Sequence, residues 1–372
     1  MSVVLFAGGG TGGHLMPALA IADAMVAADP SIEPFFVGAQ RGIEARVLPK
    51  RRWRHVLLPM EPIYRRQWWK NVRLPWSVYQ TLRQLRGVLV RESPVLAIGT
   101  GGYVSGPVLW AASLRGVPTL IQEQNAFPGF ATRRLAHRAR QIHLGFPEAR
   151  AYLEPGPRTE IFDSGNPILP PPELWLRALG DTRLRAEAKA TLFDPGRPLV
   201  LVLGGSQGAR AINQVVAEAI AGGLWPAQAQ LLWQTGSANL DELAHLAAPG
   251  RRVVGFIDPI APAYAAADLV VARAGAITSA ELAAWGLPAI LIPLPTAAAN
   301  HQLRNARALA EGGAAVLLEQ RSLTGQTLAK AVQDLLEDPA KMADLSRSIR
   351  ARARPDAARE IAHKALLLVS KK

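Results

Sequence analysis

The sequence predicts an α/β protein made of two doubly wound, Rossmann-like domains. Short apolar runs, typical of buried parallel strands, alternate with helix-like segments along both halves of the chain. A Gly-rich loop follows the first strand-like run of each half, and the two loops lie roughly 200 residues apart, too far for a solenoid repeat. The length of 372 residues exceeds one ordinary core and suits two domains. We expect the loops of both domains to face one deep cleft.

The first Gly-rich loop, residues 8–13, stands between the apolar run Val3–Phe6 and a helix-like segment at Ala18–Ala28. Glycines allow close approach of the backbone to a bound group, and a helix start offers unpaired N–H donors, so the loop predicts an anion site. The glycine spacing is not the dinucleotide fingerprint, and no Gly-Lys-Ser/Thr closes the loop, which argues against NAD binding and ATP hydrolysis. Thr11 adds a hydroxyl group and His14 a titratable one.

The rest of the first half continues the alternation. Strand-like runs follow at Pro34–Val37, Val95–Ile98, Thr119–Gln122 and Gln141–Leu144, and helix-like segments at Trp76–Arg91, Val108–Ala112 and Thr132–Ala139. Two more loops stand at strand ends, Gly99–Pro107 and Gln122–Asn125. Ligands of open α/β sheets bind beyond the carboxyl ends of the strands, so these loops should converge with the first.

The second half repeats this alternation of strand-like runs and helix-like segments. It begins after the Pro-rich stretch Pro170–Pro172, which is typical of a linker. The strand-like run Leu199–Leu203 leads into the glycine loop Gly204–Ala209 and a helix-like segment at Arg210–Ile220. Further strands are predicted at Leu231–Gln234, Arg252–Phe256, Leu269–Ala272, Ala289–Ile292 and Ala315–Leu318.

Polar side chains follow two of these strands. In Arg273–Glu281, N–H groups and the hydroxyls of Thr278 and Ser279 could hold a diphosphate, and Glu281 could accept from a ribose diol. The spacing of Thr278 and Glu281 equally fits a helix capping box, so both interpretations stay open. Asn300–Gln302 follows the run at Ala289–Ile292.

Composition narrows the class of protein. Residues 1–165 hold 20 of the 42 Lys and Arg but 11 of the 29 Asp and Glu, so the net charge of +13 is concentrated there. This excess suits nucleic acid, anionic lipid or an anionic substrate, and no nucleic-acid-binding signature accompanies it. Cysteine is absent, which fits a reducing cytoplasm. No apolar run nears twenty residues, so we expect a chain that neither spans nor crosses a membrane.

Aromatic and basic residues are interleaved from Tyr64 to Trp76 and on to Arg91. Trp favours the lipid headgroup zone and Arg favours anionic lipid, which predicts peripheral docking on an anionic membrane. Trp68, Trp69, Arg73 and Trp76 are the candidate contacts. Pro75 predicts a loop that leads into a helix beginning near Trp76. Alternatively, the tryptophans point into the core and the arginines form a solvated face.

Seven stretches, taken in order, resemble one family. They are Gly9–His14, Gly101–Pro107, Glu123–Asn125, Gly165–Pro167, Gly204–Ala209, Phe256–Asp258 and Gly275–Glu281. In order and spacing they are similar to the MurG family, the bacterial lipid I N-acetylglucosaminyltransferases, over nearly the whole chain.

The resemblance implies a GT-B glycosyltransferase. Its acceptor and membrane-side domain would span residues 1–165, its UDP-sugar domain residues 166–349, and a helix at about 350–372 would pack back on the first domain. It would transfer N-acetylglucosamine from UDP-N-acetylglucosamine to the muramoyl 4-hydroxyl of lipid I with inversion, forming lipid II for peptidoglycan. The chain would act peripherally on the cytoplasmic face of the plasma membrane, without a cofactor, and other cell-wall synthesis proteins are a further class of partner.

The family's donor contacts carry over residue by residue. They fall on Thr11, Gly12, Gly13, Asn125, Ser206, Ile257, Ala276, Ile277, Thr278, Ser279, Ala280, Glu281 and Gln302. The resemblance implies that Glu281 holds the ribose, the backbone near Ile257 the uracil, and Ser206 with the helix starts the diphosphate. Tyr103 belongs to the acceptor side.

Inversion by single displacement needs a base for the acceptor hydroxyl. A residue that titrates near neutral pH suits this role, which favours His14, with Glu123 as its competitor or orienting partner. No Asp-x-Asp pair stands at a strand end, so helix dipoles and N–H groups, not a protein-bound metal, are expected to stabilise the leaving diphosphate.

Three departures from the family pattern concern donor affinity. Leu169 stands where the family has an Arg after Gly-Asn-Pro, with Arg273 and Arg210 as candidates to supply the charge. Gln122 replaces a His, and Ala297–Ala299 replaces a more acidic stretch. The alternative enzymes are a UDP-N-acetylglucosamine 2-epimerase and a diacylglycerol glycosyltransferase, and the stretch Gly101–Pro107 favours the lipid I enzyme over both.

Overall fold

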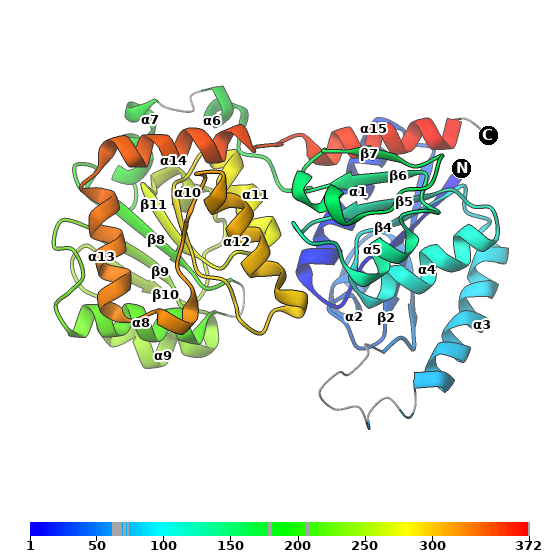
Figure 1. Ribbon diagram of the computed structural model, residues 1–372, viewed down its shortest axis with the longest axis horizontal. Coiled ribbons are helices and arrows are strands. Elements are labelled where there is room, and N and C mark those ends of the chain that lie inside the picture. Colours follow the sequence, from blue (N-terminus) through cyan, green and yellow to red (C-terminus); the bar gives the residue numbers. More distant parts are fainter. Residues whose placement is uncertain (62–68, 70–71, 73, 178–180, 206–207, 371–372) are drawn as a thin grey trace. The chain divides into compact units, whose positions relative to one another are not determined.

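The chain divides into two compact units, each an α/β domain with one parallel sheet (Figure 1). The computed structural model describes residues 1–61, 69, 72, 74–177, 181–205 and 208–370, and of Leu74 and Arg177 it describes the backbone alone. Unit 1 comprises Met1–Leu169 and Pro355–Lys372, and unit 2 comprises Pro170–Arg354. The predicted class, two α/β domains with parallel sheets, is confirmed. Among the described helices, none combines the length and apolarity that a membrane crossing requires.

Unit 1 is built on a seven-stranded sheet with the order β3-β2-β1-β4-β5-β6-β7. Its strands are β1 (Ser2–Ala7), β2 (Ile32–Ala39), β3 (Arg54–Leu58), β4 (Leu96–Gly99), β5 (Thr119–Glu123), β6 (Gln141–Leu144) and β7 (Glu160–Phe162). Its helices are α1 (Gly12–Ala28), α2 (Glu44–Val47), α3 (Leu74–Glu92), α4 (Gly102–Leu114), α5 (Phe130–Leu135) and α15 (Ala357–Ser370), with short 3-10 turns η1 (Leu48–Lys50) and η3 (Pro147–Tyr152). The core forms two layers, one under α3, α4 and α5 and the other under α1 and α15.

Helix α15 belongs to unit 1 although it follows unit 2 in the sequence. Its apolar residues Ile361, Ala365 and Leu368 are buried in the same core layer as Leu15 and Ile21 of α1. Burial of such side chains contributes about 1.5 to 3 kcal/mol each for the larger ones, enough to hold a 14-residue helix.

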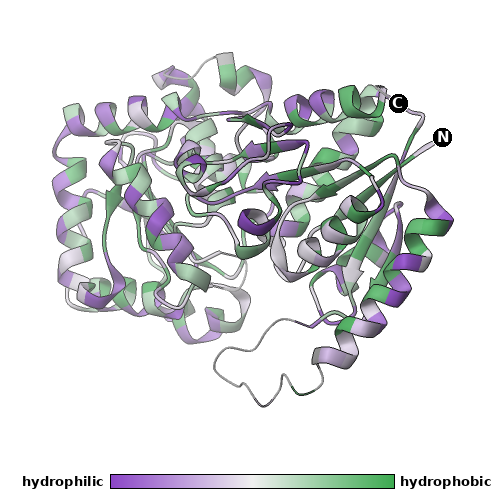
Figure 2. Ribbon diagram, turned by 45° about the vertical axis from the view of Figure 1, so that its right-hand side comes forward, coloured by the Kyte–Doolittle hydropathy of each residue, from purple (hydrophilic) through white to green (hydrophobic). Residues whose placement is uncertain are grey.

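Unit 2 is built on a six-stranded sheet with the order β10-β9-β8-β11-β12-β13. Its strands are β8 (Leu199–Leu203), β9 (Gln230–Gln234), β10 (Arg251–Val254), β11 (Leu269–Ala272), β12 (Ala289–Leu291) and β13 (Val316–Leu317). Its helices are α6 (Glu173–Arg177), α7 (Thr182–Ala190), α8 (Arg210–Ala221), α9 (Leu240–Leu243), α10 (Ala261–Ala266), α11 (Ala276–Trp285), α12 (His301–Glu311), α13 (Gly325–Leu336) and α14 (Pro339–Ala351), with 3-10 turns η4 (Ser237–Asn239), η5 (Ala244–Leu246), η6 (Ala298–Asn300) and η7 (Gln320–Ser322). Apolar residues of α8 and α13 pack together on this sheet, and the strands are mostly hydrophobic in Figure 2.

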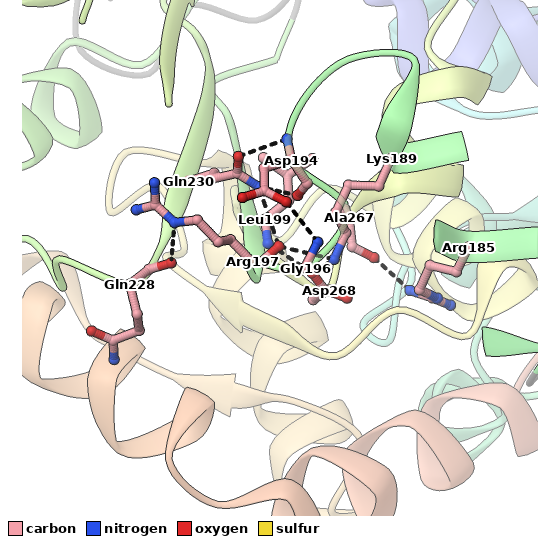
Figure 3. Close-up of polar contacts among 10 residues, drawn as sticks. All are labelled: Arg185, Lys189, Asp194, Gly196, Arg197, Leu199, Gln228, Gln230, Ala267 and Asp268. Atoms are coloured by element: carbon pink, nitrogen blue, oxygen red, sulfur yellow. Dashed lines mark hydrogen bonds and ion pairs between the residues drawn. The ribbon is translucent and has the colours of Figure 1, made fainter. Parts of the chain in front are cut away.

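A polar clasp secures the amino ends of β8, β9 and β11 in unit 2 (Figure 3). The Lys189 ammonium, nearly buried, donates to Asp268 Oδ2 at 2.6 Å and to the Arg197 carbonyl at 3.1 Å. Asp268 Oδ2 also accepts from the Leu199 amide at 2.7 Å. The side chain of Gln230 accepts from the Asp194 amide at 2.9 Å and donates to its carbonyl at 2.8 Å. The clasp therefore lies at the amino ends of these strands, opposite the carboxyl end of β8, where the glycine loop of unit 2 begins.

Two helices begin six residues earlier than the sequence predicts. Helix α1 begins at Gly12 and contains Pro17, and α4 begins at Gly102, within the predicted loop, and contains Pro107. Each proline removes one backbone hydrogen bond, and the burial of apolar side chains such as Leu15 and Val104 outweighs that loss.

Candidate functional site

The first two glycine loops of unit 1 meet at the carboxyl ends of the neighbouring strands β1 and β4. A Cβ atom on Gly102 would lie 2.1 Å from the Gly9 carbonyl oxygen, and one on Gly10 would lie 2.9 Å from the Tyr103 ring. The Thr100 hydroxyl donates to the carbonyl of His14 at 2.7 Å. The predicted convergence of these loops is found, and glycine is required because the two backbones touch.

His14 lies in the first turn of α1, half buried against the second loop. Its Nδ1 is 3.0 Å from the Thr11 hydroxyl oxygen. A Cβ on Gly101 would lie 2.7 Å from His14 Cδ2 and 3.3 Å from Gln124 Oε1. The imidazole is thus held between a hydroxyl and a glycine whose φ of 96° excludes a side chain.

Glu123, at the end of β5, has both carboxylate oxygens saturated by donors. Oε1 accepts from the amide and the side-chain nitrogen of Asn125 at 3.1 and 3.3 Å. Oε2 accepts from the Gly129 amide at 3.0 Å and the Thr132 hydroxyl at 2.7 Å. The side chain is buried, and its four hydrogen bonds connect it to residues 125, 129 and 132.

Three amide side chains connect the third loop with the Gly-Asn-Pro stretch. Gln122 Nε2 donates to Asn166 Oδ1, and Asn166 Nδ2 donates to the Gln124 carbonyl, both at 3.0 Å. Gln124 in turn donates to the Thr100 carbonyl at 2.7 Å and to the side chain of Gln122. Residue 166 is thereby fixed to the loops after β4 and β5.

In unit 2, Glu281 lies inside helix α11, which begins at Ala276 with Gly275 as its N-cap. Thr278 is therefore within the first turn, and the capping-box interpretation is wrong. The Tyr264 hydroxyl donates to Glu281 Oε2 at 3.0 Å. Burial raises the pKa of the Glu281 carboxyl, against the lowering effect of this hydrogen bond. Burial, together with the Glu281 charge, raises the pKa of Tyr264.

Three of the other predicted donor contacts, Ser279, Ile257 and Gln302, make hydrogen bonds within unit 2. The Ser279 amide donates to the Gly275 carbonyl at 2.8 Å, and its buried hydroxyl has no partner among the described residues. The Ile257 amide donates to Gln234 Oε1 at 3.0 Å, and Gln302 Oε1 accepts from the Leu294 amide at 2.9 Å. Ser206 lies outside the described residues.

Comparisons with known proteins give matches to both units of the chain. Residues 4–144 match the glycosyltransferase family 28 N-terminal domain and residues 199–361 its C-terminal domain. A Salinibacter ruber protein is 41% identical over 99% of this chain and 97% of its own length. Its name is UDP-N-acetylglucosamine--N-acetylmuramyl-(pentapeptide) pyrophosphoryl-undecaprenol N-acetylglucosamine transferase. This chain belongs to the MurG family of family 28 glycosyltransferases.

Solved structures show the same fold. The crystal structure of Acinetobacter baumannii MurG is 26% identical, covers 100% of both chains and has a TM-score of 0.78. A putative UDP-N-acetylglucosamine 2-epimerase from Listeria monocytogenes is 14% identical, covers 97% of this chain and 94% of its own, and has a TM-score of 0.62. The second likeness is one of fold alone.

The sequence predicts that Arg273 or Arg210 supplies a positive charge that Leu169 lacks. Leu169 is 87% exposed. Arg273, after β11, donates to the Ile292 carbonyl at 3.0 Å, and burial lowers the pKa of its guanidinium to about 10, which leaves it charged at neutral pH. Arg210 is exposed at the first position of α8. Arg273 therefore lies at a carboxyl strand end of unit 2, beside the start of α11.

The buried carboxylate of Glu44, which bonds to the first glycine loop, was not predicted from the sequence. Glu44 is fully buried, and its carboxylate accepts from the Gly10 amide at 2.9 Å and from the Ala39 amide at 3.0 Å. Cβ atoms on Gly9 or Gly42 would lie within 2.4 Å of that carboxylate. In the sequence Glu44 stands near Gly38 and Gly42. Nothing in that stretch indicates that Glu44 bonds to Gly10.

The aromatic and basic stretch is described only in part. Trp69 is 56% and Trp76 63% exposed, so for these two the alternative of a core position is wrong. Trp76 stacks on Tyr79, which is also exposed, with ring centroids 5.7 Å apart. Trp68 and Arg73 lie outside the described residues. Helix α3 begins at Leu74, with Pro75 in its first turn.

Proposed function

We propose that the chain transfers N-acetylglucosamine from UDP-N-acetylglucosamine to lipid I, forming lipid II. The observation that carries the proposal is the 41% identity, over 99% of the chain, to a protein named for this transfer. The alignment therefore spans both units and the loops described above. The match of both halves of the chain to family 28 domains supports the same reaction class.

The donor nucleotide would bind at the carboxyl edge of the unit 2 sheet. Glu281 supports this assignment because Tyr264 holds one carboxylate oxygen and leaves the other to accept from a ribose diol. The start of α11, with its dipole and first-turn amides, suits the diphosphate. Arg273 would add the positive charge that Leu169 cannot supply.

The acceptor hydroxyl would be activated in unit 1 by His14. As the 4-hydroxyl oxygen attacks C1 of the donor sugar, His14 takes the hydroxyl proton, and UDP leaves with the electrons of the broken C1–O bond. Thr11, 3.0 Å from Nδ1, would fix the imidazole. Glu123 is a weaker candidate because its four hydrogen bonds commit both oxygens.

The reaction is tested by incubating the protein with UDP-N-acetylglucosamine and a soluble lipid I analogue. UDP release that requires the acceptor, together with a disaccharide product, is the expected result. UDP release without acceptor would indicate an epimerase or a hydrolase instead. Donor binding without any transfer to the analogue would refute the assigned acceptor.

The membrane partner is a separate part of the proposal. Exposed Trp69, Trp76 and Tyr79 lie close in sequence to Arg83 and Arg86, which are exposed on α3. Interfacial aromatics combined with basic side chains suit an anionic headgroup surface. We infer that this face docks the chain peripherally on the cytoplasmic side of the plasma membrane.

Docking is tested by sedimentation with cardiolipin-rich vesicles. The triple variant W69A/W76A/Y79A should lose most vesicle binding and keep UDP binding. The matched control is L174A/L224A, which removes two exposed leucines of unit 2 and should bind vesicles normally. Equal binding by the triple variant and the wild type would exclude this face.

A further inference from the structure

Gln234 occupies a central position at the carboxyl edge of the unit 2 sheet. It is the last residue of β9, which lies between β8 and β10. In the register, Gln234 pairs with Leu203 on one side and Val254 on the other. These are the last residues of the strands that lead into the loops Gly204–Ala209 and Gly255–Asp258. A side chain at this point can reach both loops.

The carboxamide of Gln234 bonds to both of them. Its Nε2 donates to the Gly205 carbonyl at 3.1 Å, and its Oε1 accepts from the Ile257 amide at 3.0 Å. Gln234 is buried, with 4% of the residue exposed. Because one loop presents an acceptor and the other a donor, only a group with one donor and one acceptor end satisfies both.

The next residue strengthens the same junction. The Thr235 amide donates to the Val254 carbonyl at 2.9 Å. The Thr235 carbonyl accepts from Asn213 Nδ2 at 2.8 Å and from Asn239 Nδ2 at 3.0 Å. A Cβ on Gly208 would lie 2.1 Å from this carbonyl oxygen, so Gly208 packs directly on the strand end.

We propose that Gln234 is a positioning residue that fixes the phosphate-side loop and the base-side loop of the nucleotide site relative to each other. The proposal rests on the donor site proposed above and names a residue that does not itself contact the nucleotide. Since the Ile257 amide is committed to Gln234, the backbone group of Ile257 left to face a base is its carbonyl. By holding the Ile257 amide, Gln234 fixes the peptide unit between Phe256 and Ile257 at the start of the base-side loop.

The two hydrogen bonds can be separated by substitution. Q234M preserves length but removes both bonds. Q234E keeps an acceptor for the Ile257 amide and replaces the donor to Gly205 with a second acceptor. Q230M is the matched control, since Gln230 is the same residue type, equally buried, at the other end of β9 and within the clasp of Figure 3.

Affinities for UDP and for uridine are measured by calorimetry and by ligand-observed NMR. In Q234M both affinities should fall, that for UDP by roughly tenfold, as expected for hydrogen bonds that hold two loops. In Q234E uridine binding should be nearly retained while UDP binding falls. Q230M should lower the unfolding midpoint and leave both affinities unchanged. If Gln234 only stabilised the fold, Q234E would lower the affinities for uridine and for UDP alike.

Amide hydrogen exchange of the ligand-free protein gives a second readout. Residues 204, 205, 208 and 209, together with 255–258, should exchange faster in Q234M than in the wild type, and none of them should in Q230M. Wild-type affinities in Q234M, or unchanged exchange in either loop, would overturn the role of Gln234. A wild-type protein that binds no UDP would refute the donor site, and the exchange result would still decide whether Gln234 joins the two loops.

Discussion

One buried histidine should make unit 1 less stable as the pH falls from 7 to 5. His143, in β6, is fully buried. Its Nδ1 lies 2.9 Å from the Ser164 hydroxyl and its Nε2 3.3 Å from Gln141 Oε1, and its ring stacks on Phe162. Burial, with a smaller contribution from the Lys364 charge, lowers the pKa of His143 from 6.5 to about 3. The imidazole therefore stays neutral in the folded chain at pH 5.

The size of the effect follows from proton linkage. Between pH 6.5 and about 3 the unfolded chain carries a proton on His143 that the folded chain lacks. Stability is thus lost as the pH falls through the unfolded pKa, and the loss continues down to the folded one. Integrated from pH 7 to pH 5, this difference amounts to about 2 kcal/mol of unfolding free energy.

The variant H143Q removes the titrating group, and H137Q removes an exposed histidine of the same unit as its control. Urea unfolding at pH 7 and pH 5 gives the loss of unfolding free energy for each protein. H143Q should lose about 2 kcal/mol less than the wild type between the two pH values, whereas H137Q should behave as the wild type. The absolute stability of H143Q does not enter the comparison, because each protein is referred to its own value at pH 7.

Histidine NMR supplies the direct measurement. The His143 ring signal, identified by its absence in H143Q, should not move between pH 8 and pH 5. A His143 signal that titrates with a midpoint near 6.5 would refute the reasoning, as would an H143Q variant that shows the full wild-type loss.

Three further predictions concern the two sites and the clasp. Because the pKa of Glu281 is raised, affinity for UDP-N-acetylglucosamine should weaken with falling pH above the range of an ordinary carboxyl. E281Q should bind more weakly and lose that pH dependence in calorimetry, and an unchanged affinity would exclude the ribose role. H14A should lower kcat by roughly a hundredfold or more with donor Kd nearly unchanged, and a wild-type kcat would remove His14 as the base. K189M removes the cation that is hydrogen-bonded to the largely buried Asp268, and the nearby charge of Arg185 replaces it only in part. The unfolding free energy should fall by about 2 kcal/mol, with D268N/K189M less affected; equal urea midpoints would contradict this.

The central strands of both sheets could be predicted from the sequence, and some edge strands could not. Strands buried on both faces, such as Leu199–Leu203, form continuous apolar runs. Strand β3 begins with Arg54 and His55, and β7 has only three residues, none fully buried. At a sheet edge the backbone still pairs on one side, so the strand forms without the apolar pattern that would predict it.

The glycine loops could also be predicted, because close backbone approach restricts which residue fits. The side chains that hold those loops could not. Gln234, Tyr264 and Glu44 bond to groups from distant parts of the chain, and nothing in their own segments indicates the partner. The sequence shows Gln234 only as a polar residue that closes an apolar run. Its function follows from the order of the strands on either side.

Glu44 restricts where an anion can bind on the first glycine loop. Its carboxylate already occupies the Gly10 amide and fills the space beside Gly9, so a phosphate there would meet a negative charge and an engaged donor. At Gly12 and Gly13, the nearest atoms to an added Cβ are 3.8 Å away. The helix dipole of α1 also acts at these two residues. An anion on this loop therefore belongs at the helix start, next to Thr11, and the first glycines serve to admit Glu44 and the second loop.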